Sequence, residues 1–388
     1  MAVESLEQAL AELGSREHVL QRETRAFDAI ARGATKVVIS GCGHLGKLAF
    51  AGATRAGLNV VAFADNNPAR WGGTLEGVPI LCPADAVSTH DRHAVFVVAI
   101  YNGTSSRAQL RDLGCERIVP YPILFWQFSR YMPEEERLEL PHRILASVDD
   151  MRAGYARLSD VPSRREFAAQ IAWRCSLDYS RLPQPEPASA MYFAPDMVRL
   201  SADEVLVDCG AFDGDSIRMF LDRTSGAFRR IYAFEPDPKN RAALESYLST
   251  LPGVARARIS VFPCGVGDFN GTASFDGSGT AGSRITTTGG ADVVECRRLD
   301  DMLDGLPVTI VKMDIEGAEP GALRGATDTI RRTRPILAVC AYHKCEHLWT
   351  LPVIISGALS EYRIFLRRYA EECWETVYYA VPPERVVP

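Results

Sequence analysis

Apolar residues along the chain follow two periods that alternate, and this pattern predicts an α/β fold. Short runs rich in Val, Ile and Phe, such as residues 36–40 and 94–99, are typical of buried parallel strands. After the first run, a glycine turn leads into an Ala-rich helical stretch and then a second apolar run, so we interpret 36–67 as a βαβ unit. We expect a small Rossmann-like α/β domain over residues 1–130.

Between residues 131 and 190 the pattern changes to charged segments in which apolar residues recur three or four positions apart, as they do in helices. The segment 181–190 contains three prolines, which cannot lie inside a helix because proline has no amide hydrogen to donate. The sequence therefore predicts a helical linker region over 131–190, with a domain boundary near 183–200.

From residue 191 onward, five strand-and-helix alternations follow one another, as in an open, doubly wound parallel sheet. The last segment, 362–382, differs because two apolar runs flank a short polar stretch at Ala370, Glu371 and Glu372. That pattern predicts a hairpin. We expect a domain over 191–388 whose parallel sheet is closed by an antiparallel pair.

Charge and hydropathy narrow the classes of function. The formal net charge of −6 gives no overall field that would attract a phosphate backbone, so we expect no nucleic-acid partner. The chain has no apolar run of about 20 residues, and its first residues lack the basic and apolar regions of a signal peptide. We expect a cytoplasmic enzyme without a membrane span; the sequence leaves a homo-oligomer open.

The stretch 205–216, VLVDCGAFDGDS, is the most informative motif. An apolar strand brings Asp208 to its carboxyl end, where the glycines let the backbone turn tightly and approach a ligand before a helix begins. Open α/β sheets bind ligands at this edge. The candidate cofactor-binding residues here are Asp208, Gly210, Ala211, Asp213, Gly214 and Ser216. A glycine turn that only satisfies backbone geometry is the alternative.

An acid at the end of the next strand strengthens this interpretation. Glu235 lies 27 residues after Asp208 and is followed by Pro236. A carboxylate there can accept hydrogen bonds from both ribose hydroxyls, as the corresponding acid does in Rossmann-type sites. The alternative is a solvated loop acid.

After the third strand of this domain come Cys264, Gly265, Gly267 and Asp268. The glycines would open the rim for an adenine ring, whose edge Asp268 or a nearby backbone group could contact. Plain turn chemistry explains the stretch equally well, because Asn-Gly follows it.

Candidate catalytic residues follow the fourth and fifth strands. Asp314 and Glu316 share one face of an extended segment, and His343 follows the neighbouring strand. Histidine can act as a general base near pH 7, and the three side chains together are candidate ligands of a divalent cation. Alternatively, Glu316 caps the next helix and His343 is a surface residue.

These motifs together resemble the FkbM family of S-adenosylmethionine-dependent methyltransferases. VDCGAFDGDS is similar to the family's first motif, FEPDP to its second and MDIEGAE to its acid motif, and 362–382 resembles its final hairpin. The resemblance runs from Glu204 to Pro382. The first motif differs from the commoner family form at Phe212 and Asp213, which bears on contacts from those two side chains and not on the turn.

The resemblance implies a Rossmann-like methyltransferase sheet that O-methylates a hydroxyl of a sugar, glycolipid or secondary metabolite. It also implies that the turn from Asp208 to Gly214 holds the methionine part of S-adenosylmethionine, that Glu235 holds the ribose and that Asp314 stands near the acceptor. The partner would then be a small hydroxylated molecule, with carbohydrate as one candidate class.

The N-terminal domain carries a glycine motif of its own. GCGHLG contains Gly41, Gly43 and Gly46, and Asp65 follows 19 residues after the last glycine. This spacing would admit NAD, so an NAD(P)-dependent oxidoreductase is one alternative function, and a catalytically inactive binding module is another. The stretch 63–81 also resembles small Rossmann-like domains of sugar-modifying enzymes, which favours a degenerate nucleotide or nucleotide-sugar pocket.

Overall fold

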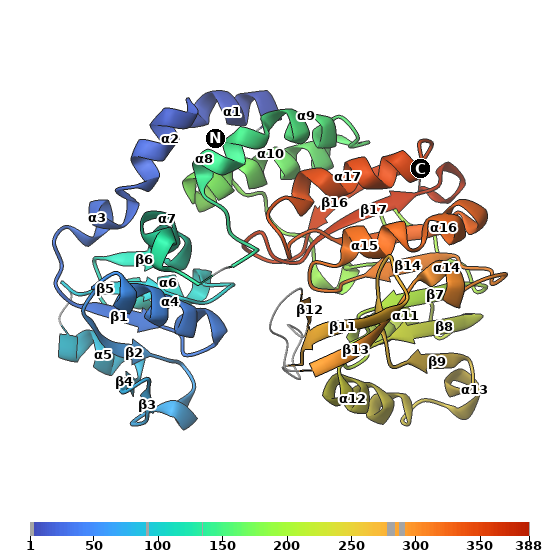
Figure 1. Ribbon diagram of the computed structural model, residues 1–388, viewed down its shortest axis with the longest axis horizontal. Coiled ribbons are helices and arrows are strands. Elements are labelled where there is room, and N and C mark those ends of the chain that lie inside the picture. The colour runs from blue at the N-terminus through green and yellow to red at the C-terminus, as the bar shows by residue number, and fades with distance from the viewer. Residues whose placement is uncertain (1–3, 91–92, 134, 278–283, 287–291, 388) are drawn as a thin grey trace. The chain divides into compact units, whose positions relative to one another are not determined.

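The computed structural model describes residues 4–90, 93–133, 135–277, 284–286 and 292–387 (Figure 1). The chain divides into two compact units, each assembled from segments that are separate in the sequence. Unit 1 comprises Met1–Val148, Ala168–Pro183 and Ala370–Trp374, and unit 2 comprises Asp149–Phe167, Gln184–Tyr369 and Glu375–Pro388.

Unit 1 contains a six-stranded sheet in the order β3-β4-β2-β1-β5-β6. Its strands are β1 (Val37–Ser40), β2 (Val60–Ala64), β3 (Thr74–Leu75), β4 (Val78–Leu81), β5 (Val95–Val98) and β6 (Ile118–Pro120). All pair in parallel except β3, which is antiparallel to β4. Every residue of β1 and β5 is buried, which explains why these strands read as continuous apolar runs.

Helices cover both faces of the unit 1 sheet. Ile39 faces a core cluster shared with α4 and α7, whereas its neighbour Val38 faces a second cluster shared with α5 and α6. The helices are α1 (Leu6–Leu13), α2 (Arg16–Glu23), α3 (Ala26–Ala31), α4 (His44–Arg55), α5 (Pro83–His90), α6 (Thr104–Asp112), α7 (Tyr121–Phe128) and α8 (Pro141–Ile144), with short 3-10 turns at η1 (Pro68–Arg70), η2 (Ser129–Tyr131), η3 (Leu145–Ser147) and η4 (Tyr179–Arg181).

Unit 2 contains a seven-stranded sheet in the order β16-β17-β15-β14-β7-β8-β9. Its strands are β7 (Val205–Cys209), β8 (Arg230–Phe234), β9 (Ile259–Phe262), β14 (Ile310–Met313), β15 (Ile336–Cys340), β16 (Arg363–Arg368) and β17 (Thr376–Val381). The first five are parallel, and β17 is antiparallel to both β15 and β16. The predicted parallel sheet with a terminal antiparallel hairpin is confirmed.

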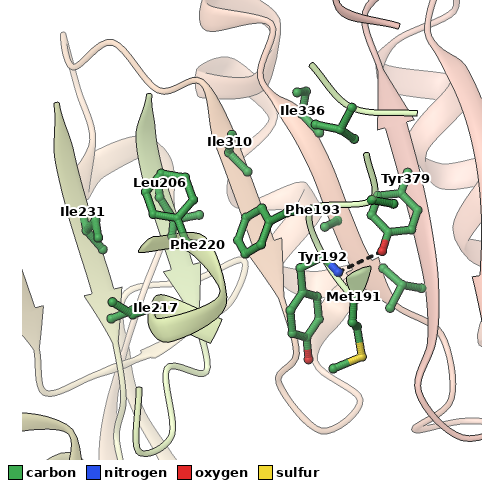
Figure 2. Close-up of a cluster of buried hydrophobic side chains, with 14 of the residues drawn as sticks. Met191, Tyr192, Phe193, Leu206, Ile217, Phe220, Ile231, Ile310, Ile336 and Tyr379 are labelled. Atoms are coloured by element: carbon green, nitrogen blue, oxygen red, sulfur yellow. Dashed lines mark hydrogen bonds between the residues drawn. The ribbon is translucent and has the colours of Figure 1, made fainter. Parts of the chain in front are cut away.

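The core of unit 2 lies between this sheet and its helices (Figure 2). Leu206 and Ile310 come from neighbouring strands and pack with Phe220 of α11. The helical elements are α9 (Val148–Tyr155), η5 (Ala188–Ala190), α11 (Asp215–Arg223), α12 (Pro238–Leu248), α13 (Gly253–Arg256), α14 (Leu299–Met302), α15 (Glu319–Arg324), α16 (Thr327–Thr333), α17 (His347–Ala358) and η6 (Pro383–Arg385); α10 (Val161–Ser176) has residues in both units. In the described part of the chain, no helix combines the length and apolar character that crossing a membrane requires.

A second, four-stranded sheet in unit 2 has the order β10-β13-β11-β12. It consists of β10 (Gly265–Val266), β11 (Gly271–Asp276), β12 (Arg284–Thr286) and β13 (Asp292–Arg297). No strand was predicted in this stretch. Glycine, aspartate and asparagine, which are weak strand formers, interrupt its apolar pattern.

The predicted linker over 131–190 does not form a separate region, because residues 149–167 belong to unit 2. Ser159 Oγ accepts a hydrogen bond from Ile364 N at 2.9 Å, and Ser163 Oγ accepts one from Leu366 N at 2.8 Å. In addition, Arg368 Nε donates to Glu166 Oε1 at 2.7 Å. The segment thus satisfies the free edge of β16, and after residues 168–183 of unit 1 the chain returns to unit 2 at Gln184.

Candidate active site

A cavity lies at the carboxyl ends of β7, β8 and β14; its empty space, including open solvent, is about 740 Å³. Open parallel sheets place their ligands at this edge. The cavity is lined by Gly210, Phe212, Asp215, Phe234, Glu235, Pro236, Asn240, Cys264, Gly265, Val266, Phe275, Lys312, Asp314, Ile315, Glu316, Ala318 and Tyr342. All of these residues belong to unit 2.

The glycine turn after β7 needs its glycines for two reasons. Gly210 and Gly214 have φ values of +79° and +91°, in the region that side chains rarely adopt. A Cβ at Gly210 would also lie 2.0 Å from the carbonyl oxygen of Asp314. The turn therefore packs closely against the residue that follows β14, and Gly210 and Asp314 both line the cavity.

Asp208 stabilises this turn through buried polar contacts and does not line the cavity. Its side chain is fully buried, and it accepts a hydrogen bond from Ser216 Oγ at 2.5 Å. The ammonium of Lys312 lies 3.1 Å from Asp208 Oδ1 and donates to the carbonyl of Gly210 at 2.6 Å. Lys312 was not identified from the sequence, although it lies in β14 two residues before Asp314, which directly follows that strand.

Glu235 lines the cavity at the end of β8. Its Oε2 accepts a hydrogen bond from Phe212 N at 2.8 Å, and its Oε1 accepts one from Asp237 N at 2.9 Å. Burial raises the pKa of Glu235 to about 7 despite these two donors. Each carboxylate oxygen can accept a further hydrogen bond, so the group is held in place with capacity for a ligand.

Apolar side chains make up much of the remaining lining. They are Phe234, Pro236, Val266, Phe275 and Ile315. Such an apolar lining suits a flat ring, because aromatic and aliphatic groups pack on ring faces.

Several of the predicted cofactor residues lie outside the cavity lining. Asp213 and Asp268 form ion pairs with Arg218 at 2.6 Å and Arg324 at 2.9 Å. Ala211, Gly214 and Ser216 belong to the turn and helix behind the lining, whereas Gly210, Glu235, Pro236, Cys264 and Gly265 line the cavity as expected. Phe212, Asp215, Asn240 and Tyr342 also line the cavity and were not predicted, because spacing alone does not report which way a side chain faces.

Asp314 lines the cavity next to two tyrosines. Its Oδ2 accepts from the hydroxyl of Tyr192 at 2.7 Å, and its Oδ1 accepts from the hydroxyl of Tyr342 at 3.1 Å. Burial would raise the pKa of Asp314, but His343 and the charge of Lys312 outweigh it and hold the pKa below its usual range. Asp314 is therefore ionised and fixed in orientation.

His343 is buried behind Asp314 and does not line the cavity. Its Nδ1 lies 2.8 Å from Glu319 Oε1, and its Nε2 lies 3.1 Å from Asp314 Oδ1 and 3.6 Å from Glu316 Oε1. Burial alone would lower the pKa of His343, but these carboxylates raise it well above its usual range. A doubly protonated imidazole has no lone pair to accept a proton. This arrangement therefore does not favour the predicted role of His343 as a general base.

The same geometry does not suit a divalent cation at Asp314, Glu316 and His343. Both ring nitrogens of His343 face carboxylates, and a metal ligand needs a free nitrogen lone pair. Within the part of the chain that the structure describes, no group of three or more His, Cys, Asp or Glu side chains is arranged to hold a metal ion.

Glu375 is a further acid near this cluster that the sequence analysis missed. It directly precedes β17 and has a φ of +51°, a strained value for a residue with a side chain. Burial and the negative charge of Asp314 raise its pKa to about 7. Because β17 is antiparallel, its beginning lies at the edge where the parallel strands end, as the 2.8 Å bond from Ala341 N to Thr376 O shows.

The chain is similar to known methyltransferases. Residues 208–369 match the profile of the methyltransferase FkbM domain. The 2-O-methyltransferase NoeI of Sinorhizobium fredii is 29% identical, with 38% of this chain and 69% of NoeI covered. The crystal structure of a methyltransferase FkbM from Methylobacillus flagellatus is similar over 94% of this chain and 100% of its own, at 25% identity and a TM-score of 0.73. These similarities relate the chain to the FkbM family of methyltransferases.

Proposed function

We propose that this methyltransferase takes its methyl group from S-adenosylmethionine and transfers it to a hydroxyl oxygen of a small molecule, with carbohydrate as the favoured acceptor class. The observation that carries the proposal is Glu235. Its carboxylate is fixed by two backbone amides at the end of β8 and lines a cavity that also has apolar side chains in its lining. These are the features that a ribose and an adenine require.

The residues of the cavity fit the cofactor in three parts. The turn at Gly210, with Asp215 and Lys312, provides charged and polar groups for the methionine part. Glu235 accepts from the ribose hydroxyls, and the apolar lining residues Phe234, Pro236 and Val266 contact the adenine. When bound, the cofactor supplies an electrophilic methyl group on a sulfonium.

Asp314 is the proposed partner of the acceptor hydroxyl. Tyr192, Tyr342 and His343 fix its carboxylate, so one of its oxygens can orient the hydroxyl toward the methyl group. The hydroxyl proton becomes strongly acidic as the new carbon–oxygen bond forms, so even a carboxylate with a lowered pKa can accept it. Alignment of this kind supplies roughly 7–11 kcal/mol of a barrier, and proton transfer adds about 10²–10⁴-fold.

Two observations support a hydroxyl acceptor of low molecular mass. The relative NoeI is described as a 2-O-methyltransferase, which names oxygen as its target atom. The net charge of −6 argues against a nucleic-acid substrate. A cytoplasmic location and a homo-oligomer stay predictions.

The experiment that tests the proposal uses the full chain and cofactor with an isotopically labelled methyl group. The protein is incubated with fractionated small hydroxylated metabolites and oligosaccharides, and products are analysed by mass spectrometry. We expect the label in a methyl ether of a sugar-containing product. Label on nitrogen or carbon, or in protein or RNA, would contradict the proposed acceptor class.

A further inference from the structure

Glu316 lines the cavity of unit 2, but the proposed methyl transfer gives it no task. Its backbone has a φ of +53°, a value that residues with a side chain seldom adopt. Such a conformation persists only where the surrounding structure holds it in place, and it is found most often at active sites. The contacts on either side of Glu316 show what holds it.

Glu319 holds the backbone on both sides of Glu316. Its Oε1 accepts a hydrogen bond from Ile315 N at 3.0 Å and a longer one from Gly317 N at 3.4 Å. The Glu319 side chain is fully buried and does not line the cavity. Burial would raise the pKa of Glu319, but the positive charge of His343 outweighs it and holds the pKa below its usual range. The carboxylate is therefore ionised, which strengthens its hydrogen bonds to the two amides.

The carboxylate of Glu316 lies close to that of Asp314. His343 Nε2 is 3.1 Å from Asp314 Oδ1 and 3.6 Å from Glu316 Oε1, so both carboxylates face the same imidazole nitrogen. The side chains of Asp314 and Glu316 are 20% and 11% exposed, and both residues line the cavity. Since neighbouring carboxylates repel each other, the positive charge of His343 beside them stabilises the pair. A molecule held by Asp314 therefore comes within reach of Glu316.

We propose that Glu316 binds a second hydroxyl of the acceptor, next to the hydroxyl that Asp314 orients, and that Glu319 is the residue that positions it. The inference rests on the proposed transfer to a hydroxyl. An ionised carboxylate accepts hydrogen bonds and donates none, so the pair selects an acceptor with two neighbouring hydroxyls, as the ring of a sugar has. It disfavours an acceptor with a carboxylate or phosphate beside the methylated hydroxyl, because like charges repel.

The role of Glu316 is tested by labelled methyl transfer from the full chain to the hydroxylated fraction that the wild-type enzyme labels, over a range of fraction concentrations. We expect Glu316→Ala to raise the acceptor KM by about tenfold or more, because a charge-assisted hydrogen bond is lost. The kcat should change less than about threefold, and the affinity for S-adenosylhomocysteine should not change.

An unchanged KM, or a weaker affinity for S-adenosylhomocysteine, would overturn the inference and leave the proposed function standing. A product without a hydroxyl on the carbon next to the new methyl ether would do the same. A wild-type enzyme that labels no hydroxylated compound would instead overturn the proposed function, and this inference with it.

Variants of Glu319 test whether it acts through Glu316. Glu319→Ala removes the acceptor of both amide hydrogen bonds and should raise the acceptor KM as Glu316→Ala does, whereas Glu319→Gln keeps an oxygen there and should restore most of the affinity. The double variant with both alanines should have the KM of Glu316→Ala alone, because both changes remove the same contact. Losses that add, or a lowered melting temperature of Glu319→Ala with an unchanged KM, would contradict the positioning role. If Glu319→Ala does not fold, Glu319→Gln combined with Glu316→Ala decides by the same criterion.

Asp300→Asn is the matched control. Asp300 also accepts hydrogen bonds from two backbone amides, Asp328 N at 3.3 Å and Thr329 N at 2.7 Å, but it does not line the cavity. Its variant should leave the acceptor KM unchanged. An equal rise of KM in Asp300→Asn and Glu319→Ala would show that any loosened loop weakens acceptor binding, and would overturn the specific role of Glu319.

Discussion

At the scale of single residues, the proposed cofactor recognition depends on the protonation of Glu235. Burial raises its pKa to about 7, and two backbone amides hold the carboxylate in the cavity. A group whose pKa is raised in the folded protein opposes folding once it ionises, so this part of the stability is present below about pH 4.5 and lost as pH rises through about 7. A ligand that donates hydrogen bonds to the carboxylate reverses this preference.

Binding of S-adenosylhomocysteine should therefore strengthen as pH rises from 6 to 8, because ribose hydroxyls favour the ionised carboxylate. Calorimetric titrations across this range measure the effect. In Glu235→Gln the dependence should vanish, since the amide does not titrate. An affinity that falls with rising pH in the wild type would contradict the assignment.

Variants of Asp314 should lose turnover, whereas variants of His343 should lose stability. Asp314→Asn keeps the shape of the side chain but cannot accept the proton, so turnover should fall by about 10²–10⁴ with little change in cofactor affinity. His343→Gln removes the cation between buried carboxylates, and it should lower the free energy of unfolding by about 3–5 kcal/mol.

The stability that His343 contributes is fully present below about pH 6.5 and is lost only as pH rises through its raised pKa. Transfer of the labelled methyl group measures the effect on turnover, and urea denaturation measures the effect on stability. A stable His343→Gln variant whose rate alone falls would restore the general-base role.

At the scale of elements, the features that were hardest to predict depend on contacts between segments far apart in the sequence. Alternation of apolar runs indicated the five parallel strands and the hairpin. It could not indicate that β17 pairs with β15, which brings Glu375 to the ligand-binding edge. The hydrogen bonds between residues 149–167 and β16 could not be predicted either. The polar side chains of residues 149–167 follow the pattern expected for the exposed faces of linker helices.

The contribution of residues 149–167 to the stability of β16 can be tested at the ion pair of Glu166 with Arg368. Their side chains are 9% and 0% exposed, so Glu166→Gln leaves a buried cation without its carboxylate and should cost about 3–5 kcal/mol of unfolding free energy. Asp268→Asn is the control, because its pair with Arg324 is exposed and should be worth at most about 1 kcal/mol. Equal losses in the two variants, measured by urea denaturation, would contradict the role given to residues 149–167. Unchanged cofactor affinity in Asp268→Asn would also agree with its place outside the cavity.

At the scale of the whole molecule, the sequence indicated two α/β domains and placed the cofactor in the second. Every residue of the proposed cofactor cavity lies in unit 2. The interruption of each unit by segments of the other was beyond prediction, since apolar periodicity reports local structure and not which distant segments pack together. A fragment of residues 190–388 would lack Asp160 and Glu166, which pair with Arg367 and Arg368, so we expect it to be less stable than the full chain.

Titration of the full chain with S-adenosylhomocysteine and, separately, with NAD is the most direct test of the central claim. We predict one site for S-adenosylhomocysteine and none for NAD at pH 8. We also predict at least a tenfold loss of affinity in folded Glu235→Gln, because charge-assisted hydrogen bonds are worth roughly 1.5–3 kcal/mol each. Binding of NAD alone, or an unchanged dissociation constant in Glu235→Gln, would contradict the account.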